Sequence, residues 1–218
     1  MVFKLVIFLF LFSFSSSAQV GFNHYSSFSK LKANHKEGKD FKIIFKDRLK
    51  KDKTRTLVMA MHGCKVEQGT TELSEAIAGE KYSYYSFCGL KEEKKYPELL
   101  LDPLLHITSA HFDEPKLMEM VNKCDRCLSI HGFSNDGVDF CIGGRNDVRR
   151  AELLKSLLRD FPEFKSCELC CKPYLGISKK NPVNLCKTPG VQIEMSARVR
   201  KKILEDSEFK KKLAQAMR

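Results

Sequence analysis

The sequence predicts an α/β domain built in layers around a mostly parallel or mixed β-sheet. Short apolar runs rich in β-branched and aromatic residues alternate along the chain with segments of helical spacing. This alternation is typical of a sheet that is covered by helices. Ligands of such proteins bind beyond the ends of the strands, so polar side chains at strand ends are the first candidates for a functional site.

The first predicted strand is 41–45 (FKIIF), and the charged run 47–54 that follows it reads as a turn. A second, more buried strand is expected at 56–61 because this segment is almost entirely apolar. Residues 71–79 (TELSEAIAG) have helical spacing and end on a glycine, a common helix stop. The aromatic segment 82–87 (YSYYSF) favours a third strand.

The middle of the chain repeats the alternation of strands and helices. The short apolar segment 104–109 predicts a strand, and 115–123 predicts a helix with proline in its first turn. The apolar segments 127–130 and 138–142 predict two further strands. Apolar residues recur with helical spacing over 148–161, which indicates an amphipathic helix.

The segments 19–40 and 162–217 show a less regular alternation of predicted strands and helices. Residues 19–40 are polar and show no clear period, and 162–190 is expected to be a loop because it contains four prolines and a group of cysteines. The segment 190–195 (GVQIEM) predicts the last strand. Residues 198–217 are basic and have the spacing of a helical tail.

The first 18 residues have the features of a secretory signal peptide. Lys4 precedes an apolar run over 5–14, and small residues end at Ala18, the expected cleavage site. The alternative is an uncleaved anchor, but the apolar run is short for a membrane span and no second hydrophobic stretch follows it. We therefore expect a signal peptide at 1–18, a single domain at 19–218, secretion, and no stable membrane insertion.

The chain contains nine cysteines, an odd number that leaves at least one thiol unpaired within the chain. Export would permit disulfide bonds. The spacings Cys124-x-x-Cys127 and Cys167-x-x-Cys170-Cys171 also occur in zinc sites, but neither has a matching second half at a standard spacing. Local disulfides are therefore the favoured interpretation, with the pairing left open.

The formal net charge is +11, and it becomes +10 when Lys4 leaves with the signal peptide. A basic secreted domain attracts polyanions, which include nucleic acid, anionic membrane, acidic polysaccharide and acidic polypeptide. Lysine-rich runs occur at 46–53 and 198–212, and solvated faces alone would account for most of this charge. The charge therefore indicates a class of partner without identifying one.

Three predicted strands are followed or ended by residues that can bind a metal or move a proton. His62 follows the apolar run 57–60 and precedes Glu67, His131 follows 127–130, and Glu194 lies in 190–195. Two histidines and one carboxylate suit a catalytic zinc site, which has three protein ligands and one open position. Taken singly, each histidine is more often structural, and Glu194 fits a buried salt bridge as well as catalysis.

A family resemblance connects these residues. Ordered blocks over roughly residues 26–203 resemble the phage-derived poly-γ-glutamate hydrolases, a family of zinc hydrolases with metallocarboxypeptidase-like chemistry. The blocks are GKDFKI (38–43), HGCKVEQGTTE (62–72), AIAG (76–79), SYYSFCG (83–89), LHITSAHFDEP (105–115), LSIHGF (128–133), IGGRND (142–147) and GVQIEMSARVR (190–200).

The resemblance implies a three-layer α/β/α zinc hydrolase with a central mixed, largely parallel sheet. It implies one Zn²⁺ bound by His62, Glu67 and His131, with Glu194 as the catalytic general base. The implied reaction is cleavage of γ-glutamyl amide bonds in poly-γ-glutamate, a polyanionic substrate. We expect a monomer and no nucleic-acid partner.

Other basic and histidine side chains have weaker assignments. Arg145 and Arg198 are the leading candidates for binding substrate carboxylates because each lies beside a matched strand end, and Lys187 is a further candidate. Arg149 and Arg200 belong to the same group of candidates, with a solvated face as the default for each. His106 and His111 are expected to have structural roles.

The chain departs from the family pattern at three places. Cys64 stands where a glycine is expected and would either form a disulfide or compete for the metal. Lys187 stands where an arginine is expected, which replaces a bidentate clamp by a point charge. The third departure is the cysteine-rich insertion at 167–171.

Two other functions fit the same residues. One is a zinc peptidase or amidase that acts on another amide, such as a peptide C-terminus or a cell-wall γ-glutamyl bond, with loops 91–103 and 162–189 setting the preference. The other is a non-catalytic basic secreted binding protein. The joint presence of His62, Glu67, His131 and Glu194 argues against the second, because a relict scaffold would be free to lose them.

Overall fold

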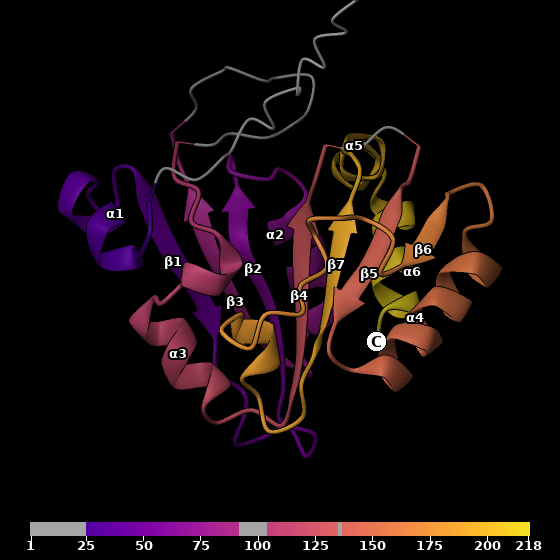
Figure 1. Cartoon of the computed structure of the whole chain (residues 1–218), viewed down its shortest axis with the longest axis horizontal. Coiled ribbons are helices and arrows are strands. Elements are labelled where there is room, and N and C mark those ends of the chain that lie inside the picture. Colours follow the sequence, from indigo (N-terminus) through magenta and orange to yellow (C-terminus); the bar gives the residue numbers. More distant parts are fainter. Residues whose placement is uncertain (1–24, 92–103, 135–136) are drawn as a thin grey trace, which may run out of the picture.

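The computed structural model describes residues 25–91, 104–134 and 137–218. Its centre is a seven-stranded sheet with the order β1-β3-β2-β4-β7-β5-β6 (Figure 1). The strands are β1 (Phe41–Lys46), β2 (Thr56–Cys64), β3 (Ser83–Gly89), β4 (Arg126–Gly132), β5 (Phe140–Gly144), β6 (Ser166–Glu168) and β7 (Val191–Met195). The predicted signal peptide, residues 1–18, lies outside the described residues.

Four of the six strand pairs are parallel, which confirms the predicted mixed and largely parallel sheet. The two antiparallel pairs are β1 with β3 and β5 with β7. The carboxyl ends of β2, β3, β4 and β7 therefore meet at one edge of the sheet. Because β5 runs against β7, its carboxyl end lies at the opposite edge.

Helices cover both faces of the sheet, so the predicted three-layer architecture is confirmed (Figure 1). The helices on one face are α2 (Thr70–Ala78), α4 (Asp147–Asp160), α5 (Ala197–Glu205) and α6 (Ser207–Ala216). On the other face lie α1 (Phe28–Asn34) and α3 (Pro115–Val121).

Strand β2 shows how the sequence fills both cores. Val58 packs into the core under α2, α4, α5 and α6, whereas its neighbours Leu57 and Met59 pack into the core under α1 and α3. Successive side chains of a strand point to opposite faces, so an unbroken apolar run is what a strand buried on both faces requires. Each such buried side chain stabilises the fold by about 1.5–3 kcal/mol.

Two strands extend further than the sequence indicates, and this changes the place of the site residues. β2 continues to Cys64 and β4 to Gly132, so His62 and His131 lie inside strands instead of following them. The β2–β3 register shifts between Ala60 and Gly63, which lets β2 bend and still keep its pairing with β3.

The prediction of a strand at 104–109 is wrong. Ile107 forms only an isolated bridge with Tyr25, and a short 3-10 helix follows at Ser109–His111. The Ile107 carbonyl group contacts the imidazole of His62, so this segment serves the site and does not extend the sheet.

Three regions contain more structure than expected. The polar stretch 19–40 includes α1, and the loop 162–190 includes β6 and a 3-10 helix at Pro182–Asn184. The predicted tail 198–217 is two helices, because the Asp206 carboxylate accepts a hydrogen bond from the Phe209 N–H and starts α6 there. Within the described ranges, no helix has the length and apolar character needed to cross a membrane.

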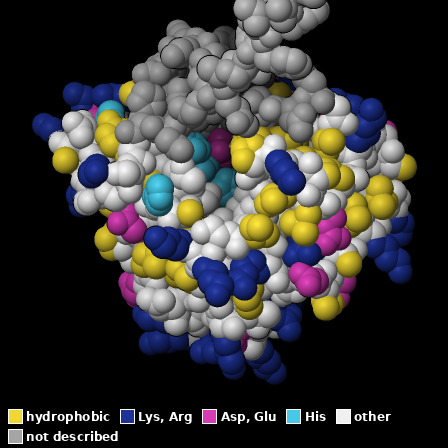
Figure 2. Space-filling view, viewed as in Figure 1, with side chains coloured by type: hydrophobic (Ala, Val, Ile, Leu, Met, Phe, Trp, Pro, Cys, Tyr) yellow, Lys and Arg dark blue, Asp and Glu magenta, His cyan; other side chains and the backbone are white. Residues whose placement is uncertain are grey.

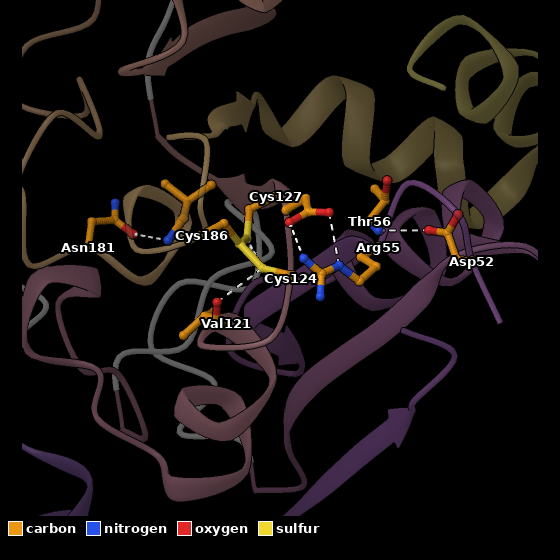
Figure 3. The surroundings of a disulfide bond; sticks show 10 residues. Asp52, Arg55, Thr56, Val121, Cys124, Cys127, Asn181 and Cys186 are labelled. Carbon is orange, nitrogen blue, oxygen red and sulfur yellow. Dashed lines mark hydrogen bonds and ion pairs between the residues drawn. A yellow bond between two sulfur atoms is a disulfide. The ribbon is translucent and has the colours of Figure 1, made fainter. Parts of the chain in front are cut away.

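The cysteines gather in three groups. Cys64 forms a disulfide with Cys88 and ties the ends of β2 and β3 together, which is one of the two roles considered for it. Cys124, Cys127 and Cys186 lie at the start of β4 in mutual contact (Figure 3). The third group is Cys141, Cys167, Cys170 and Cys171 near β5 and β6.

Candidate metal centre and active site

Three neighbouring strands bring the candidate residues together. β2, β4 and β7 carry His62, His131 and Glu194 at the same edge of the sheet, and the register places His131 directly beside Glu194. Glu67 is supplied by the turn after β2, where its N–H donates to the His62 carbonyl oxygen at 2.9 Å. Helix α2 begins at Thr70, whose hydroxyl donates to the carbonyl groups of His62 and Glu67 and holds this turn in place.

The side chains of His62, Glu67 and His131 converge. His62 Nδ1 lies 2.7 Å from Glu67 Oε1 and 3.1 Å from His131 Nδ1, and His131 Nδ1 lies 3.6 Å from Glu67 Oε2. All three residues are at most 5% exposed. Figure 2 shows histidine side chains beside an acidic side chain in a recess of this face of the molecule.

The outer contacts of the two imidazoles leave both Nδ1 atoms for the centre of the site. His62 Nε2 lies 2.8 Å from the Ile107 carbonyl oxygen, and His131 Nε2 lies 2.8 Å from the Ser129 hydroxyl. If His62 Nε2 carries the proton that it donates to Ile107, its Nδ1 lone pair faces the Glu67 carboxylate and the His131 nitrogen. In that tautomer His62 offers Nδ1 to a cation that Glu67 and His131 can also reach.

These donors fit a zinc ion. Two imidazole nitrogens and a carboxylate oxygen that lie within 4.8 Å of one another are a suitable three-ligand set, and histidine ligands that hydrogen-bond through their other nitrogen are fixed in orientation. Besides this set, the described residues offer two groups of sulfur ligands, the cysteine groups named above.

The surroundings shift the acidity of the two carboxyl groups in opposite directions. Burial raises the pKa of Glu67, but the nearby His62 and His131 outweigh it and hold that pKa below the ordinary range. Burial, with the negative charge of Glu67, raises the pKa of Glu194 well above the usual value for a glutamate. The Gln192 amide, which donates to Glu194 Oε1 at 2.7 Å, and Arg200 oppose this rise without cancelling it.

Arg200 is buried beside these carboxylates, although the sequence favoured Arg145 and Arg198 over it. Arg200 is 0% exposed, and its guanidinium donates to the carbonyl groups of Met195 and Gln68 at 3.2 Å. Burial lowers its pKa to about 10, against the favourable charges of Glu67 and Glu194. It therefore places a positive charge next to the site.

Glycines make room for Arg200. A Cβ atom on Gly132 would lie 2.5 Å from Arg200 Nε, and one on Gly69 would lie 3.1 Å from Arg200 Cβ. These glycines follow His131 and Glu67 in the two matched blocks. A glycine at each of these positions is consistent with a large side chain packing against the backbone, but the sequence does not identify that side chain as Arg200.

His106, for which the sequence predicts a structural role, lies beside this site. Its ring centroid lies 4.1 Å from that of His62, and its Nε2 lies 3.9 Å from Glu67 Oε1. The segment around Ile107 that contacts His62 carries it there.

The structure does not bring the three predicted substrate-binding residues to the cluster. Arg145 is exposed and follows β5, whose carboxyl end lies at the opposite edge because β5 and β7 are antiparallel. Arg198 is directed to Asp139 and to the face of the Phe164 ring. Lys187 is exposed, and its N–H donates to the Cys124 carbonyl group just before β4, whereas His131 lies at the far end of that strand.

Comparisons with known proteins identify the family of this chain. The sequence profile of the family described as "Poly-gamma-glutamate hydrolase" matches residues 25–217. The protein YndL of Bacillus subtilis (strain 168) is 34% identical over 181 residues, which are 82% of this chain and 66% of YndL. The SPbeta prophage-derived protein YoqZ of the same organism is 31% identical over 87% of this chain and 65% of YoqZ. The chain thus spans slightly less than two thirds of both relatives.

Two solved structures are similar in fold. The structure described as zinc-free YndL superposes with a TM-score of 0.71 at 33% identity and covers 83% of each chain. A bacteriophage poly-γ-glutamate hydrolase superposes with a TM-score of 0.73 at 23% identity and covers 89% of this chain and 96% of that one. At this lower identity the second likeness shows a shared fold.

Proposed function

Since this chain belongs to the poly-γ-glutamate hydrolase family, we propose that it is a secreted, zinc-dependent hydrolase that cleaves the γ-glutamyl amide bonds of poly-γ-glutamate. The observation that carries this proposal is the convergence of His62, Glu67 and His131 beside Glu194. The zinc-free description of the YndL structure supports the metal, because it names the ion for a relative that is 33% identical.

His62, Glu67 and His131 would hold the ion through the two Nδ1 atoms and a Glu67 oxygen. A bound zinc ion supplies Lewis-acid chemistry, which favours nucleophilic attack on an amide carbonyl group. Ile107 and Ser129 fix the two imidazole rings from behind. The protein thereby sets the ligand positions before substrate binds.

Glu194 is the general base in this proposal. It takes a proton from the attacking water as the water oxygen bonds to the amide carbon, and it gives that proton to the amide nitrogen as the carbon–nitrogen bond breaks. The burial of Glu194 directly beside His131 suits this role, because the carboxyl group can reach the reacting atoms and is shielded from bulk water. Gln192 holds the carboxyl group in place through its contact with Oε1.

Charge supports a polyanionic substrate. Poly-γ-glutamate carries one carboxylate per residue, and the chain carries a formal net charge of +11. Lysine and arginine side chains are spread over the face that Figure 2 displays. We propose further that residues 1–18 direct export and that the enzyme acts as a monomer.

The test is release of fragments from poly-γ-glutamate by chain 19–218, with zinc and with a chelator. We expect shorter products by size-exclusion chromatography and mass spectrometry, loss of cleavage with chelator, and recovery with added zinc. An α-linked polyglutamate is the matched substrate control. Cleavage of α-linked peptide alone would assign the site to another amide, and cleavage of neither polymer would favour a binding protein.

A further inference from the structure

A group of four cysteines lies next to the proposed active site on the far side of β7. Cys141 belongs to β5, Cys167 to β6, and Cys170 and Cys171 to the turn that follows. Their sulfur atoms all lie within 4.8 Å of one another. The structure joins Cys167 to Cys170, whereas Cys141 and Cys171 remain buried thiols.

The two thiols face each other in an apolar setting. Cys141 is 0% exposed, Cys171 is 2% exposed, and both pack with Phe133 in one small cluster. The Cys141 and Cys171 sulfur atoms lie within 4.8 Å of each other, and Cys170 Sγ lies 4.0 Å from Cys141 Sγ and 3.4 Å from Cys171 Sγ. Two thiols so placed in an exported chain are suited to form a disulfide.

We propose that Cys141 and Cys171 form a disulfide, and that this bond and Cys167–Cys170 together hold residues 171–176 as one wall of the active site. The bond forms by exchange with a disulfide-bearing oxidant such as oxidised glutathione. Two thiols lose two protons and two electrons, and the oxidant is reduced to two thiols. The pairing rests on the proposed export of the chain, whereas the active-site wall rests on the proposed hydrolase activity.

The segment 171–176 crosses the face of the sheet that carries Glu194. Cys141 pairs with Glu194 and Gly143 pairs with Gln192, so these four side-chain positions share one face. The Leu175 carbonyl group accepts from the Gly144 N–H at 2.9 Å.

Glycine allows this close approach. A Cβ on Gly143 would lie 2.3 Å from the Leu175 oxygen, and a Cβ on Gly176 would lie 2.8–2.9 Å from the Gln192 side chain. Gln192 in turn donates to Glu194. The segment therefore packs directly on the residue that positions the proposed base.

Tyr174 is the side chain that this segment presents to the site. Its N–H donates to the Cys171 carbonyl group at 2.7 Å, and its ring meets Phe133, two residues after His131, edge to face at 5.8 Å. Burial and the charges of Glu194 and Glu67 raise the pKa of its hydroxyl, which therefore stays a neutral hydrogen-bond donor. The phenol is within reach of the Ser134 side chain, and a hydroxyl that accepts there can still donate to a carboxylate or carbonyl oxygen of the polymer.

Because the chain has nine cysteines, the number of free thiols shows whether Cys141 and Cys171 are paired. Cys64 and Cys88 form one bond, and the group of Cys124, Cys127 and Cys186 can form only one, because a sulfur makes a single disulfide although Cys186 reaches both partners (Figure 3). With Cys141 bonded to Cys171, nine cysteines give four disulfides and one thiol. If Cys141 and Cys171 stayed reduced, three thiols would remain.

The first test is alkylation of the secreted protein after unfolding without reductant, followed by peptide mapping. We expect one alkylated cysteine per chain, within the Cys124, Cys127 and Cys186 group, and a cross-link from Cys141 to Cys171. Alkylation of Cys141, or its linkage to any other cysteine, overturns the proposal. A zinc ion that is retained by wild type and lost in Cys141→Ser also overturns it, because the sulfurs would then be metal ligands.

The second test asks whether the Cys141–Cys171 bond shapes the active site or only stabilises the fold. The double variant Cys141→Ala with Cys171→Ala should raise KM for poly-γ-glutamate fragments several-fold and change kcat little. The matched control is Cys124→Ala with Cys186→Ala, which removes one disulfide at the opposite edge of the sheet. Both pairs should lower Tm, and an equal KM in the two double variants would refute the active-site wall.

The two proposals fail in distinguishable ways. The count of alkylated thiols does not depend on any activity, so the pairing can hold for a chain that does not cleave poly-γ-glutamate. Tyr174→Phe removes only the phenol oxygen. Tyr174→Phe should raise KM for poly-γ-glutamate fragments, as the Cys141→Ala and Cys171→Ala double variant does. The number of alkylated thiols per chain should remain one.

Discussion

Glu194 shows at the scale of one residue how burial decides chemistry. On an apolar strand it fitted either a salt bridge or a general base. The structure places it next to His131 with its Oε1 held by Gln192, and burial with the Glu67 charge raises its pKa. A carboxyl group that prefers to bind a proton beside a metal-ligand set suits proton transfer more than a fixed ion pair.

We expect Glu194→Gln to lower kcat/KM on poly-γ-glutamate by about 10²–10⁴-fold, since the amide keeps the shape of the side chain but cannot take the proton. Fragment release under initial-rate conditions measures the loss. Zinc content and Tm should stay close to those of the wild type, because Glu194 is not one of the three ligands. If Glu194→Gln and the wild type released fragments at the same rate and held the same amount of zinc, Glu194 would not be the general base.

Gly132 is a second residue whose identity depends on its neighbour. A Cβ at this position would lie 2.5–2.8 Å from Nε, Cδ and Cζ of Arg200, which is fully buried and donates to the Met195 and Gln68 carbonyl groups. We expect Gly132→Ala to destabilise the protein by about 1–3 kcal/mol, which is the usual effect of overpacking.

Urea unfolding measures this loss, and a double-mutant cycle with Arg200→Met gives the control. In the Arg200→Met background the flexible methionine can move, so Gly132→Ala should have a smaller effect. An equal effect in both backgrounds would show that the clash with Arg200 is not the cause.

At the scale of elements, the turn before β2 depends on one buried carboxylate. Asp52 accepts hydrogen bonds from the Thr54 N–H, the Thr54 hydroxyl and the Thr56 N–H at 2.7–2.9 Å. Burial raises the pKa of Asp52, but these hydrogen bonds outweigh it and lower that pKa below its ordinary value. The charged form therefore fixes the start of the strand that carries His62.

The sign of the pH dependence follows from the lowered pKa. Asp52 stabilises the folded state above the pKa of an unfolded aspartate, and the stabilisation is lost as the pH falls through the folded pKa. We expect Asp52→Asn to destabilise the protein by about 2 kcal/mol at neutral pH and by less at about pH 3. Urea unfolding across this range measures the difference.

The control for this measurement is Glu205→Gln, which changes an exposed carboxylate near the end of α5. Its effect on stability should be small at every pH, because exposed ion pairs contribute little. A constant difference between wild type and Asp52→Asn from neutral to acid pH would contradict the role of the Asp52 charge.

At the scale of the whole molecule, the site joins three strands of the sheet with the turn after β2. Two imidazoles and a carboxylate meet there in a buried space, with the His62 Nδ1 atom 2.7 Å from Glu67 Oε1 and 3.1 Å from His131 Nδ1. An ion that binds the folded state alone stabilises the whole domain, by about 3–4 kcal/mol at 100–1,000 times Kd.

We therefore expect a chelator to lower Tm and abolish cleavage together, and added zinc to restore both. Differential scanning calorimetry measures the shift. In a His62→Ala and His131→Ala double variant, zinc should leave Tm unchanged. A chelator that leaves the wild-type Tm and activity intact would exclude a structural and catalytic role for the ion.

The sequence by itself determined the local and compositional features of this protein. Apolar periodicity located β1, β2, β3, β4, β5 and β7 and the helices α2, α3 and α4, because these signals depend on neighbours along the chain. It also named His62, Glu67, His131 and Glu194 as candidates. The matched blocks provided the family, which the profile match confirmed.

Only the tertiary structure decided which side chains meet. The antiparallel pairing of β5 with β7 carries Arg145 away from the site, whereas the turn from β7 into α5 brings Arg200 into it. The same pairing sets Cys141 beside Glu194, and the parallel pairing of β5 with β6 sets Cys141 beside Cys167, so that Cys141 joins the cysteines at 167–171. Strand order and direction depend on contacts between distant segments, and local sequence patterns do not record those contacts.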